Sequence, residues 1–294
     1  MSEWILEAQS LHYHYPCGKA ALNGLDLRIA RGARLAVLGA NGAGKTTLFL
    51  CLNGLLRPQT GCLKVNGFPA GYRKRDLLEW RQRVGLVFQN PDDQVVAGNV
   101  LQDVAFGPLN LGLPPDAARQ RACEALDVLA LGGIRDMPTH ELSFGMRKLV
   151  AIAGVLAMRP EVIVLDEPTA GIDPEGAQQV LEALAAVQRQ GTALVISTHD
   201  MDLAWEWADE VAVLVEGRTV RQGMVTDIFA DTGLLHQARL HQPWLSAVTA
   251  DLHEAGVLPP GSQPRYRKEF LHIAMEAFNT RNQKETPCMT SKKS

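Results

Sequence analysis

The sequence predicts an α/β fold in which helices cover both faces of a largely parallel sheet. Short apolar runs, typical of strands buried on both faces, recur along the chain, for example at 35–39 and 162–165. Segments of helical composition separate these runs, as they do in the crossovers between parallel strands. A glycine-rich turn directly after the first buried run opens one of these helices. These three observations together indicate the fold class.

The strands of the first third are expected at 5–15, 25–29, 35–39, 62–65 and 84–88. The first two alternate apolar and polar residues, as half-buried strands do. The segment 44–56 has helical composition and stops before Pro58, which cannot continue a helix.

The middle of the chain, from residue 103 to 159, has a helical pattern, and strands return after it. One helix is predicted over 117–131, with Asp116 as its N-cap, and a second begins after Ser143 and ends before Pro160. Strands are expected at 161–166, 193–197 and 211–215, with helices over 174–190 and 200–208.

The character of the chain changes after Gly223, so we expect a domain boundary near residue 225. Residues 226–245 have room for two short helices. The predicted organisation is a main domain over 3–225, a helical C-terminal extension over 226–280 and a disordered tail over 281–294.

Length and composition are those of a globular protein of about two domains at roughly 150 residues each. The chain has 294 residues, of which 46% are hydrophobic and 21% charged. These values exclude a collagen, a long disordered chain and a disulfide-stabilised miniprotein. The net charge of −3 argues against a general nucleic-acid coat protein, although a local basic patch is still compatible with it. We expect no nucleic-acid partner.

No run approaches the roughly 18–20 apolar residues that span a bilayer, and the N-terminus lacks the basic start of a signal peptide. We therefore expect a cytoplasmic chain. The five cysteines are odd in number and show no CxxC spacing, which favours reduced thiols over disulfides or a zinc ribbon. His12 and His14 lack a further ligand at suitable spacing, so no metal site is expected there.

The turn after the strand at 35–39 carries a phosphate-binding motif. Residues 39–46 read GANGAGKT and fit GxxxxGK[ST] at every fixed position. The glycines let backbone N–H groups surround an anion, and the helix N-terminus adds partial positive charge. The residues expected to hold a nucleotide are Gly39, Asn41, Gly42, Ala43, Gly44, Lys45, Thr46 and Thr47.

Within this loop, Lys45 is expected to reach the β- and γ-phosphates, and the Thr46 hydroxyl to bind Mg²⁺. A second motif supports this prediction, because the apolar run 162–165 ends in Asp166 and Glu167. A carboxylate at the end of a buried strand suits a Walker B aspartate that positions Mg²⁺. Glu167, one residue further, is the expected general base for the attacking water.

The order of these motifs resembles that of an ABC-type ATPase. The resemblance rests on residues 39–46, Gln89, the stretch LSFGM at 142–146, the Asp166–Glu167 pair and His199, and it covers about residues 3–225. It implies ATP and Mg²⁺ as cofactors. It also implies an ABC-type P-loop NTPase domain: a mixed sheet core with a β-subdomain and a helical signature subdomain, followed here by the short helical extension.

The resemblance implies further roles. Gln89 would be the Q-loop residue, which senses Mg²⁺ and water. His199 would be the switch histidine that contacts the γ-phosphate, and Asp173 would lie in the D-loop at a dimer interface. Tyr15 would stack on adenine, with Tyr13 as the competing candidate.

Ser143 and Gly145 would form the signature motif, which faces the γ-phosphate held by an opposite subunit. Ser143 also suits the N-cap of the following helix, and both roles are compatible. The motif departs from the common LSGGQ at Phe144 and Met146, and we expect weaker or slower closure of the dimer as a result.

A narrower resemblance links 88–114 and 150–174 to the ATP-binding subunit of energy-coupling-factor (ECF) importers, in the cobalt/nickel branch. It implies two partners, an integral-membrane coupling protein and a substrate-binding membrane component, and a peripheral position on the cytoplasmic face of the membrane. Asp92 and Asp93 would be contacts to the coupling protein, unless they form only a solvated turn.

The resemblance also implies a second ATPase subunit, most simply a second copy of this chain. Two copies would close head to tail around two ATP molecules, and the C-terminal extension would add to their interface. A homodimer and a heterodimer both remain open, as does the ion. The alternatives are an ECF vitamin importer, another ABC transporter, or a soluble ABC ATPase that acts on nucleic acid or ribosomes.

Overall fold

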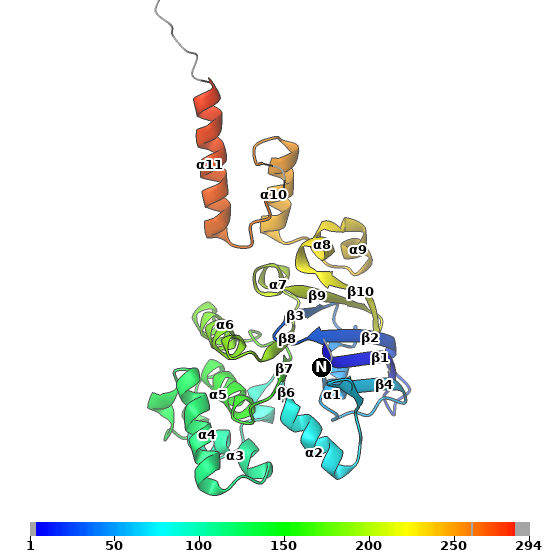
Figure 1. The fold of residues 1–294 in the computed structure, drawn as a ribbon, viewed down its shortest axis with the longest axis vertical. Helices are drawn as coiled ribbons and strands as arrows, with labels where there is room; N and C mark the ends of the chain where they lie inside the picture. Colours follow the sequence, from blue (N-terminus) through cyan, green and yellow to red (C-terminus); the bar gives the residue numbers. More distant parts are fainter. Residues whose placement is uncertain (1–3, 260, 286–294) are drawn as a thin grey trace, which may run out of the picture.

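The computed structural model describes residues 4–259 and 261–285, and its strands form two sheets (Figure 1). The strands are β1 (Trp4–His14), β2 (Ala20–Ala30), β3 (Arg34–Leu38), β4 (Thr60–Val65), β5 (Phe68–Pro69), β6 (Val84–Val87), β7 (Val162–Leu165), β8 (Ala193–Ser197), β9 (Glu210–Val215) and β10 (Arg218–Met224). The helices are α1 (Lys45–Leu52), α2 (Lys74–Arg83), α3 (Val100–Asn110), α4 (Pro115–Val128), α5 (Phe144–Leu156), α6 (Pro174–Arg189), α7 (Met201–Trp207), α8 (Val225–Ala230), α9 (Thr232–Gln237), α10 (Trp244–Glu254) and α11 (Arg267–Glu285).

The larger sheet has the order β10-β9-β3-β8-β7-β6. From β9 to β6 all neighbours are parallel, and β10 pairs antiparallel with β9. Strands β3, β7 and β8 are adjacent and almost wholly buried. Because they run in parallel, their carboxyl ends meet at one edge of the sheet, which is where a ligand site is expected in such folds.

The smaller sheet is antiparallel, with the order β2-β1-β4-β5. Strand β2, at one edge of this sheet, lies beside β10 of the larger sheet. The Gln222 side chain on β10 accepts a hydrogen bond from the Arg28 backbone N–H at 3.1 Å and donates one to the Arg28 carbonyl at 2.7 Å. This amide therefore replaces a missing strand neighbour and links the two sheets.

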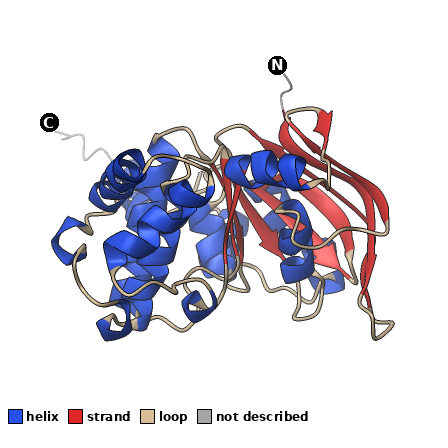
Figure 2. Cartoon of the chain, turned by 90° about the horizontal axis from the view of Figure 1, so that it is seen from below, coloured by secondary structure: helices blue, strands red, loops and turns tan. Residues whose placement is uncertain are grey.

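Helices α3, α4 and α5 pack on one another on the far side of the larger sheet from the smaller one. Figure 2 shows the resulting division, with most helices on one side of the molecule and the strands on the other. Apolar residues of all three helices join one core cluster with residues of the larger sheet. The three helices correspond to the helical subdomain that the sequence predicted.

The C-terminal helices α10 and α11 lie at the opposite end of the molecule from α3–α5 (Figure 1). They are fastened to α7: the Trp205 indole N–H donates to the Pro264 carbonyl at 3.0 Å, and the Trp244 backbone N–H donates to Asp202 at 2.8 Å. The Arg265 guanidinium donates to two carbonyls at the end of α7. Within the described residues, none of the helices is both long and apolar enough to cross a membrane.

Several elements differ from the sequence predictions. Asp116 is not the N-cap of its helix, because α4 already begins at Pro115, whose fixed φ suits the first helical position. Asp116 instead lies in the first turn, where its charge interacts favourably with the helix dipole. The edge strand β10 was not predicted, since its sequence RTVRQGM shows no clear apolar alternation.

The boundary of the C-terminal extension stays a prediction, although the larger sheet ends at Met224 and α8 begins at Val225. Residues 281–285, expected in the disordered tail, form the last part of α11. The rest of the expected tail, 286–294, lies outside the described residues. Cys17, Cys51, Cys62 and Cys123 are free thiols, and Cys288 lies outside the described part of the chain.

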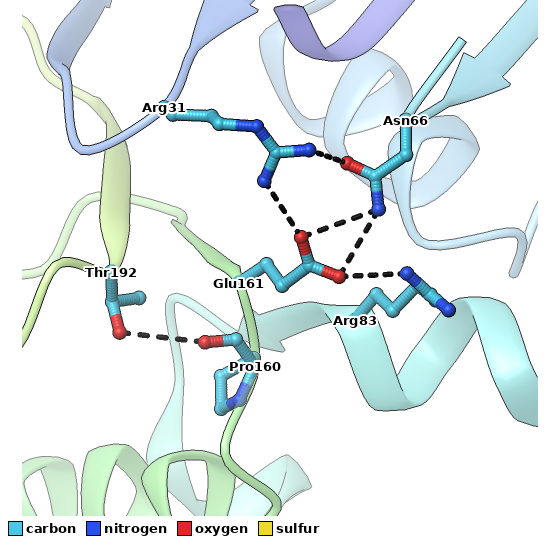
Figure 3. A network of polar contacts seen from close by, with 6 residues as sticks. All are labelled: Arg31, Asn66, Arg83, Pro160, Glu161 and Thr192. Carbon is cyan, nitrogen blue, oxygen red and sulfur yellow. Dashed lines mark hydrogen bonds and ion pairs between the residues drawn. The ribbon is translucent and has the colours of Figure 1, made fainter. Parts of the chain in front are cut away.

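A polar network joins both sheets at the end remote from the carboxyl edge (Figure 3). The Glu161 carboxylate lies at its centre, 3.0 Å from Arg31 Nη1 and 2.9 Å from Arg83 Nη1, and accepts from the Asn66 amide at 3.1 and 3.2 Å. Burial raises the pKa of Glu161, but the hydrogen bonds from Arg31 and Asn66 and the charge of Arg83 outweigh it and lower the pKa below 4.5.

We expect Glu161→Gln to lower the free energy of unfolding by about 1–2 kcal/mol, because it removes a charge that accepts several hydrogen bonds. A carboxylate with a lowered folded-state pKa stabilises fully above its unfolded pKa, and this stabilisation is lost as the pH falls through the folded pKa. Urea unfolding measures the free energy of unfolding of wild type and of Glu161→Gln at pH 7 and at several pH values below 4.5. The two free energies are expected to converge as the pH falls.

The control for this prediction is Glu124→Gln, which removes an exposed carboxylate whose Oε2 lies 2.8 Å from Arg159 Nη2. This variant is expected to leave the free energy of unfolding unchanged. Equal stability of wild type and Glu161→Gln at pH 7 would contradict the prediction.

Candidate nucleotide site

The predicted phosphate loop connects β3 to α1 and has a shape that requires glycine. A Cβ atom at Gly39 would lie 2.5 Å from the Leu214 carbonyl oxygen, and one at Gly44 would lie 2.5 Å from the Ala21 carbonyl oxygen. Gly44, at φ 102°, is also the N-cap of α1. No residue with a Cβ atom fits either position, and the absence of side chains there lets the loop backbone approach a bound anion closely.

Most of the predicted nucleotide residues line one cavity of about 250 Å³. Its lining consists of Tyr15, Lys19, Ala21, Asn41, Gly42, Gly44, Lys45, Thr46, Thr47, Gln89, Asp166 and Glu167. The structure thus brings together the acidic pair directly after β7, the phosphate loop and the Q-loop residue Gln89. Lys19 was missed at the sequence level, since it lies in a turn with no recognisable motif.

Lys45 is almost buried, and its ammonium group points back into the loop. Its Nζ donates to the Gly39 carbonyl at 2.7 Å and to the Ala40 carbonyl at 3.4 Å. Burial lowers the pKa of Lys45, while the negative charges of Glu167 and Asp166 oppose that shift. The loop therefore carries a cation whose present partners are backbone carbonyls, which an anionic ligand would replace.

The Asp166 carboxylate is held by two hydroxyl groups. Thr46 Oγ1 donates to one carboxylate oxygen at 2.7 Å, and Ser197 Oγ donates to the other at 2.5 Å. Oxygen donors from a threonine, an aspartate and the Gln89 amide form the kind of ligand set that Mg²⁺ prefers. The residues present therefore fit the metal predicted from the sequence.

Ser197 was missed by the sequence analysis. It is fully buried at the end of β8, next to β7, and also accepts a hydrogen bond from the Glu167 backbone N–H at 2.9 Å. The available signal was a hydroxyl residue closing the apolar run 193–197, but only the strand order shows which acidic residues it contacts.

Glu167 adopts a left-handed backbone conformation, with φ 46°. Its carboxylate Oε2 lies 2.9 Å from His199 Nδ1. The Glu167 side chain is 12% exposed, whereas that of His199 is 72% exposed. Backbone strain of this kind concentrates at functional sites. The two residues predicted to handle the attacking water are thus in direct contact.

The adenine-stacking candidate Tyr15 lines the cavity, and Tyr13 is not among the lining residues described. The strand expected over 5–15 was predicted one residue too long at its end, because β1 ends at His14 and Tyr15 lies in the turn beyond it. The Tyr15 hydroxyl is 2.9 Å from Thr47 Oγ1. The Tyr15 and Tyr13 rings pack edge to face, with their centroids 5.1 Å apart.

The predicted signature and D-loop residues lie apart from this cavity within one chain: neither Ser143, Gly145 nor Asp173 is among the lining residues described. Ser143 is the N-cap of α5, as predicted, and accepts from the Met146 N–H at 3.2 Å. Asp173 is the N-cap of α6 and accepts from the Gly176 N–H at 2.8 Å.

The signature turn and the D-loop are neighbours. A methyl group at Gly145 would lie 3.3 Å from Ile172 Cγ2, and one at Gly171 would lie 3.5 Å from Phe144 Cε1. The Phe144 ring, which departs from the common motif, therefore lies beside the D-loop backbone. The two segments predicted to meet a second subunit form one continuous surface.

The Q-loop is attached to α5 by two consecutive basic residues. Lys148 donates to the carbonyls of Phe88, at 3.0 Å, and Gln89, and Arg147 Nε lies 2.8 Å from Asp92 Oδ1. Burial lowers the pKa of Lys148 to about 8, although Asp166 and Glu167 oppose the shift. Lys148 was missed at the sequence level, because a lysine in a helix normally reaches solvent.

Comparison with known proteins agrees with this geometry. The family model described as ABC transporter matches residues 22–170. The energy-coupling factor transporter ATP-binding protein EcfA of Methanocaldococcus jannaschii is 45% identical over 256 residues, which are 87% of this chain and 92% of that protein. This chain belongs to the ABC transporter family. As an ABC ATPase it binds ATP and couples ATP hydrolysis to transport.

Two further proteins resemble this ABC ATPase closely. The cobalt import ATP-binding protein CbiO of Rhodobacter capsulatus is 49% identical over 239 residues, 81% of this chain and 85% of that protein. The structure of cbiO1 from Clostridium perfringens, part of the ABC transporter complex cbiONQ, has a TM-score of 0.72 and 40% identity, over 86% of this chain and all of that one.

A dimeric ATP-binding cassette in a post-hydrolysis state, bound to ADP and Pi, matches with a TM-score of 0.67 and 23% identity, over 75% of this chain and 98% of that one. At this identity the match shows the fold alone. It confirms the predicted ABC ATPase fold for this chain.

We expect Ser197→Ala to lower the kcat of this ABC ATPase at least tenfold, because Asp166 and the Glu167 backbone both lose a partner that fixes their positions. The free energy of unfolding is expected to fall by about 1–2 kcal/mol, since the Glu167 N–H is left without an acceptor. Steady-state phosphate release and urea unfolding measure the two effects.

The matched control is Thr192→Ala, whose hydroxyl donates to the Pro160 carbonyl at 3.4 Å (Figure 3). Thr192 lies just before β8, at the opposite end of that strand from Ser197. This variant is expected to keep wild-type kcat. A Ser197→Ala protein with unchanged kcat would show that the hydrogen bonds of the Ser197 hydroxyl to Asp166 and Glu167 are not needed for hydrolysis.

Proposed function

We propose that this chain is the ATP-hydrolysing subunit of an ECF-type importer that carries cobalt or nickel ions. The observation that supports this most is the 49% identity to the cobalt import ATP-binding protein of Rhodobacter capsulatus over 81% of the chain. The structural likeness to cbiO1 extends over 86% of the chain and includes part of the C-terminal extension.

In this proposal the nucleotide occupies the cavity between the phosphate loop and Tyr15. Backbone N–H groups of residues 39–44 and the Lys45 ammonium group bind the phosphates, and Tyr15 stacks on adenine. Lys45 gives up its carbonyl partners for the β- and γ-phosphate oxygens. The oxygen atoms of Thr46, Asp166 and Gln89 would hold Mg²⁺, which would neutralise part of the phosphate charge when bound.

Glu167 is the proposed general base. Its carboxylate is almost buried and lies beside the cavity, which suits removal of a proton from a water molecule. His199, whose Nδ1 already contacts Glu167, orients the carboxylate and reaches the γ-phosphate. Gln89 completes the set from the Q-loop side of the same cavity.

A second copy of the chain completes each site. The cavity is lined within one chain by the phosphate loop, whereas Ser143, Gly145 and Asp173 lie on a separate surface. A head-to-tail homodimer places the N-cap end of α5 from one chain opposite the γ-phosphate held by the other. In this proposal residues 3–225 form the ATPase domain, and the extension over 226–280 adds to the dimer contact.

Movement of the dimer is passed to the membrane through the Q-loop. We place the coupling protein on the surface around Asp92 and Asp93, both exposed, at the cytoplasmic face of the membrane. A separate membrane component holds the transported ion. This arrangement makes the chain a peripheral membrane protein without a nucleic-acid partner.

The ion is tested by uptake. The chain is expressed with its two membrane partners, reconstituted in vesicles with internal ATP, and offered radioactive Co²⁺, Ni²⁺ or riboflavin. Uptake of Co²⁺ or Ni²⁺ alone supports the proposal. Uptake of the vitamin alone would assign the chain to an ECF vitamin importer, in keeping with relatives named for energy-coupling factor transport without a substrate.

We predict that Glu167→Gln binds ATP with near-wild-type affinity but hydrolyses it at least tenfold more slowly, because the amide cannot accept the proton from water. Equilibrium binding of labelled ATP and single-turnover hydrolysis measure the two steps separately. Near-normal turnover would remove Glu167 from the role of base.

We predict that Asp92→Ala combined with Asp93→Ala leaves ATP binding intact but weakens assembly with the membrane partners. Co-purification of the complex measures assembly. Asp116→Ala, which removes an exposed carboxylate from α4, serves as the control and is expected to assemble normally. Unchanged recovery of the double variant would contradict the docking surface proposed here.

A further inference from the structure

The Lys148 side chain is fully buried, although lysine is rarely found without solvent contact. Its Nζ donates to the Phe88 carbonyl at 3.0 Å and to the Gln89 carbonyl. A buried ammonium group is unfavourable unless hydrogen bonds replace its hydration. The two carbonyls provide that replacement, so the position of Lys148 and the path of the Q-loop backbone depend on each other.

The contacted residues lie where the Q-loop leaves the sheet. Strand β6 ends at Val87, whose carbonyl accepts from the Asp166 N–H at 3.0 Å. Two residues beyond it, Gln89 lines the nucleotide cavity. Lys148 therefore binds the backbone at the point that sets the direction of the Gln89 side chain.

The rest of the loop is held in place from both sides. The Gln94 side chain accepts from the Phe88 N–H at 3.0 Å and donates to the Leu86 carbonyl at 3.1 Å, which closes the loop on itself. Arg147, the neighbour of Lys148 on α5, pairs with Asp92 at 2.8 Å. Through these contacts the first turns of α5 and the Q-loop form one connected unit.

The same helix begins at the signature motif, because Ser143 is the N-cap of α5. The distance along the helix from Ser143 to Lys148 is little more than one turn. A shift of α5 that moves the Ser143 end therefore also moves the amine that holds the Gln89 backbone.

We propose that Lys148 is a positioning residue for ATP hydrolysis: by holding the carbonyls of Phe88 and Gln89, it makes the place of the Gln89 side chain in the nucleotide cavity depend on the place of the signature helix. The inference rests on the proposed function, because it takes Gln89 to act on bound ATP. It adds a physical link between the motif that meets the opposite subunit and the loop that meets the membrane partner.

The test is a double-mutant cycle on the full-length chain, with Lys148→Met, Gln89→Ala and both together. Lys148→Met keeps the length of the side chain and removes the donor. We expect it to lower kcat at least tenfold and to leave the Kd for labelled ATP within threefold of wild type. In the Gln89→Ala background the same change is expected to alter kcat less than twofold, because the group through which Lys148 acts is already absent.

The matched control is Leu149→Ala, at the next residue of α5. The Leu149 side chain is buried in the core and is apolar, so it donates no hydrogen bond to the Q-loop carbonyls. This variant is expected to lower the melting temperature but to keep kcat within twofold at a temperature where it is folded. An equal loss of kcat in Leu149→Ala would attribute the effect of Lys148→Met to core damage and overturn the inference.

The outcomes separate this inference from the proposed function. If Gln89→Ala alone keeps wild-type kcat, the role proposed for Gln89 is wrong and the inference falls with it. If Gln89→Ala slows hydrolysis but Lys148→Met does not, only the role of Lys148 is wrong. The same conclusion holds if the fold-loss of kcat in the double variant equals the product of the losses in the two single variants. Should Lys148→Met fail to fold, Lys148→Gln, which keeps a donor of shorter reach, takes its place in the same cycle.

Discussion

The nucleotide site depends on the convergence of three parallel strands at one edge of the sheet. Val37 of β3 pairs with Ser197 of β8, and Leu165 of β7 pairs with Ile196 of the same strand. This register brings the Asp166 carboxylate between the hydroxyls of Thr46 and Ser197. A carboxylate held on both oxygens in a buried position has a fixed direction, and the phosphate loop, Glu167 and the Q-loop are all arranged around it.

One chain carries two separate surfaces to which we assign roles in ATP hydrolysis. The cavity side holds the cationic loop and the acidic pair, while the other side combines the N-terminal ends of α5 and α6 with the loop between Gly171 and Asp173. Helix N-termini attract anions, and both of these are capped by side chains from their own chain. The separation of the two surfaces explains why pairing of two chains is part of the proposed mechanism.

The helical region is joined to the ATPase core through polar contacts as well as through apolar packing. Lys148 and Arg147 bind the Q-loop at its backbone and at Asp92. At the other end of the molecule, Arg265 and Trp205 fasten the C-terminal extension to α7, the helix that follows His199. These polar contacts thus attach the helical region to the Q-loop and the C-terminal extension to the helix that follows His199.

The sequence by itself determined the α/β class, the phosphate loop and the acidic pair, because each of these depends on residues close together in the chain. The GANGAGKT turn needs only its glycines and the preceding strand, and Asp166 needs only the end of a buried run. The tertiary structure alone decided which hydroxyl holds Asp166, which carbonyls receive Lys148, which tyrosine lines the cavity and how Glu161 joins the two sheets. These contacts connect residues from about 30 to about 130 positions apart. Their partners are set by strand order and register, which no local pattern of side chains specifies.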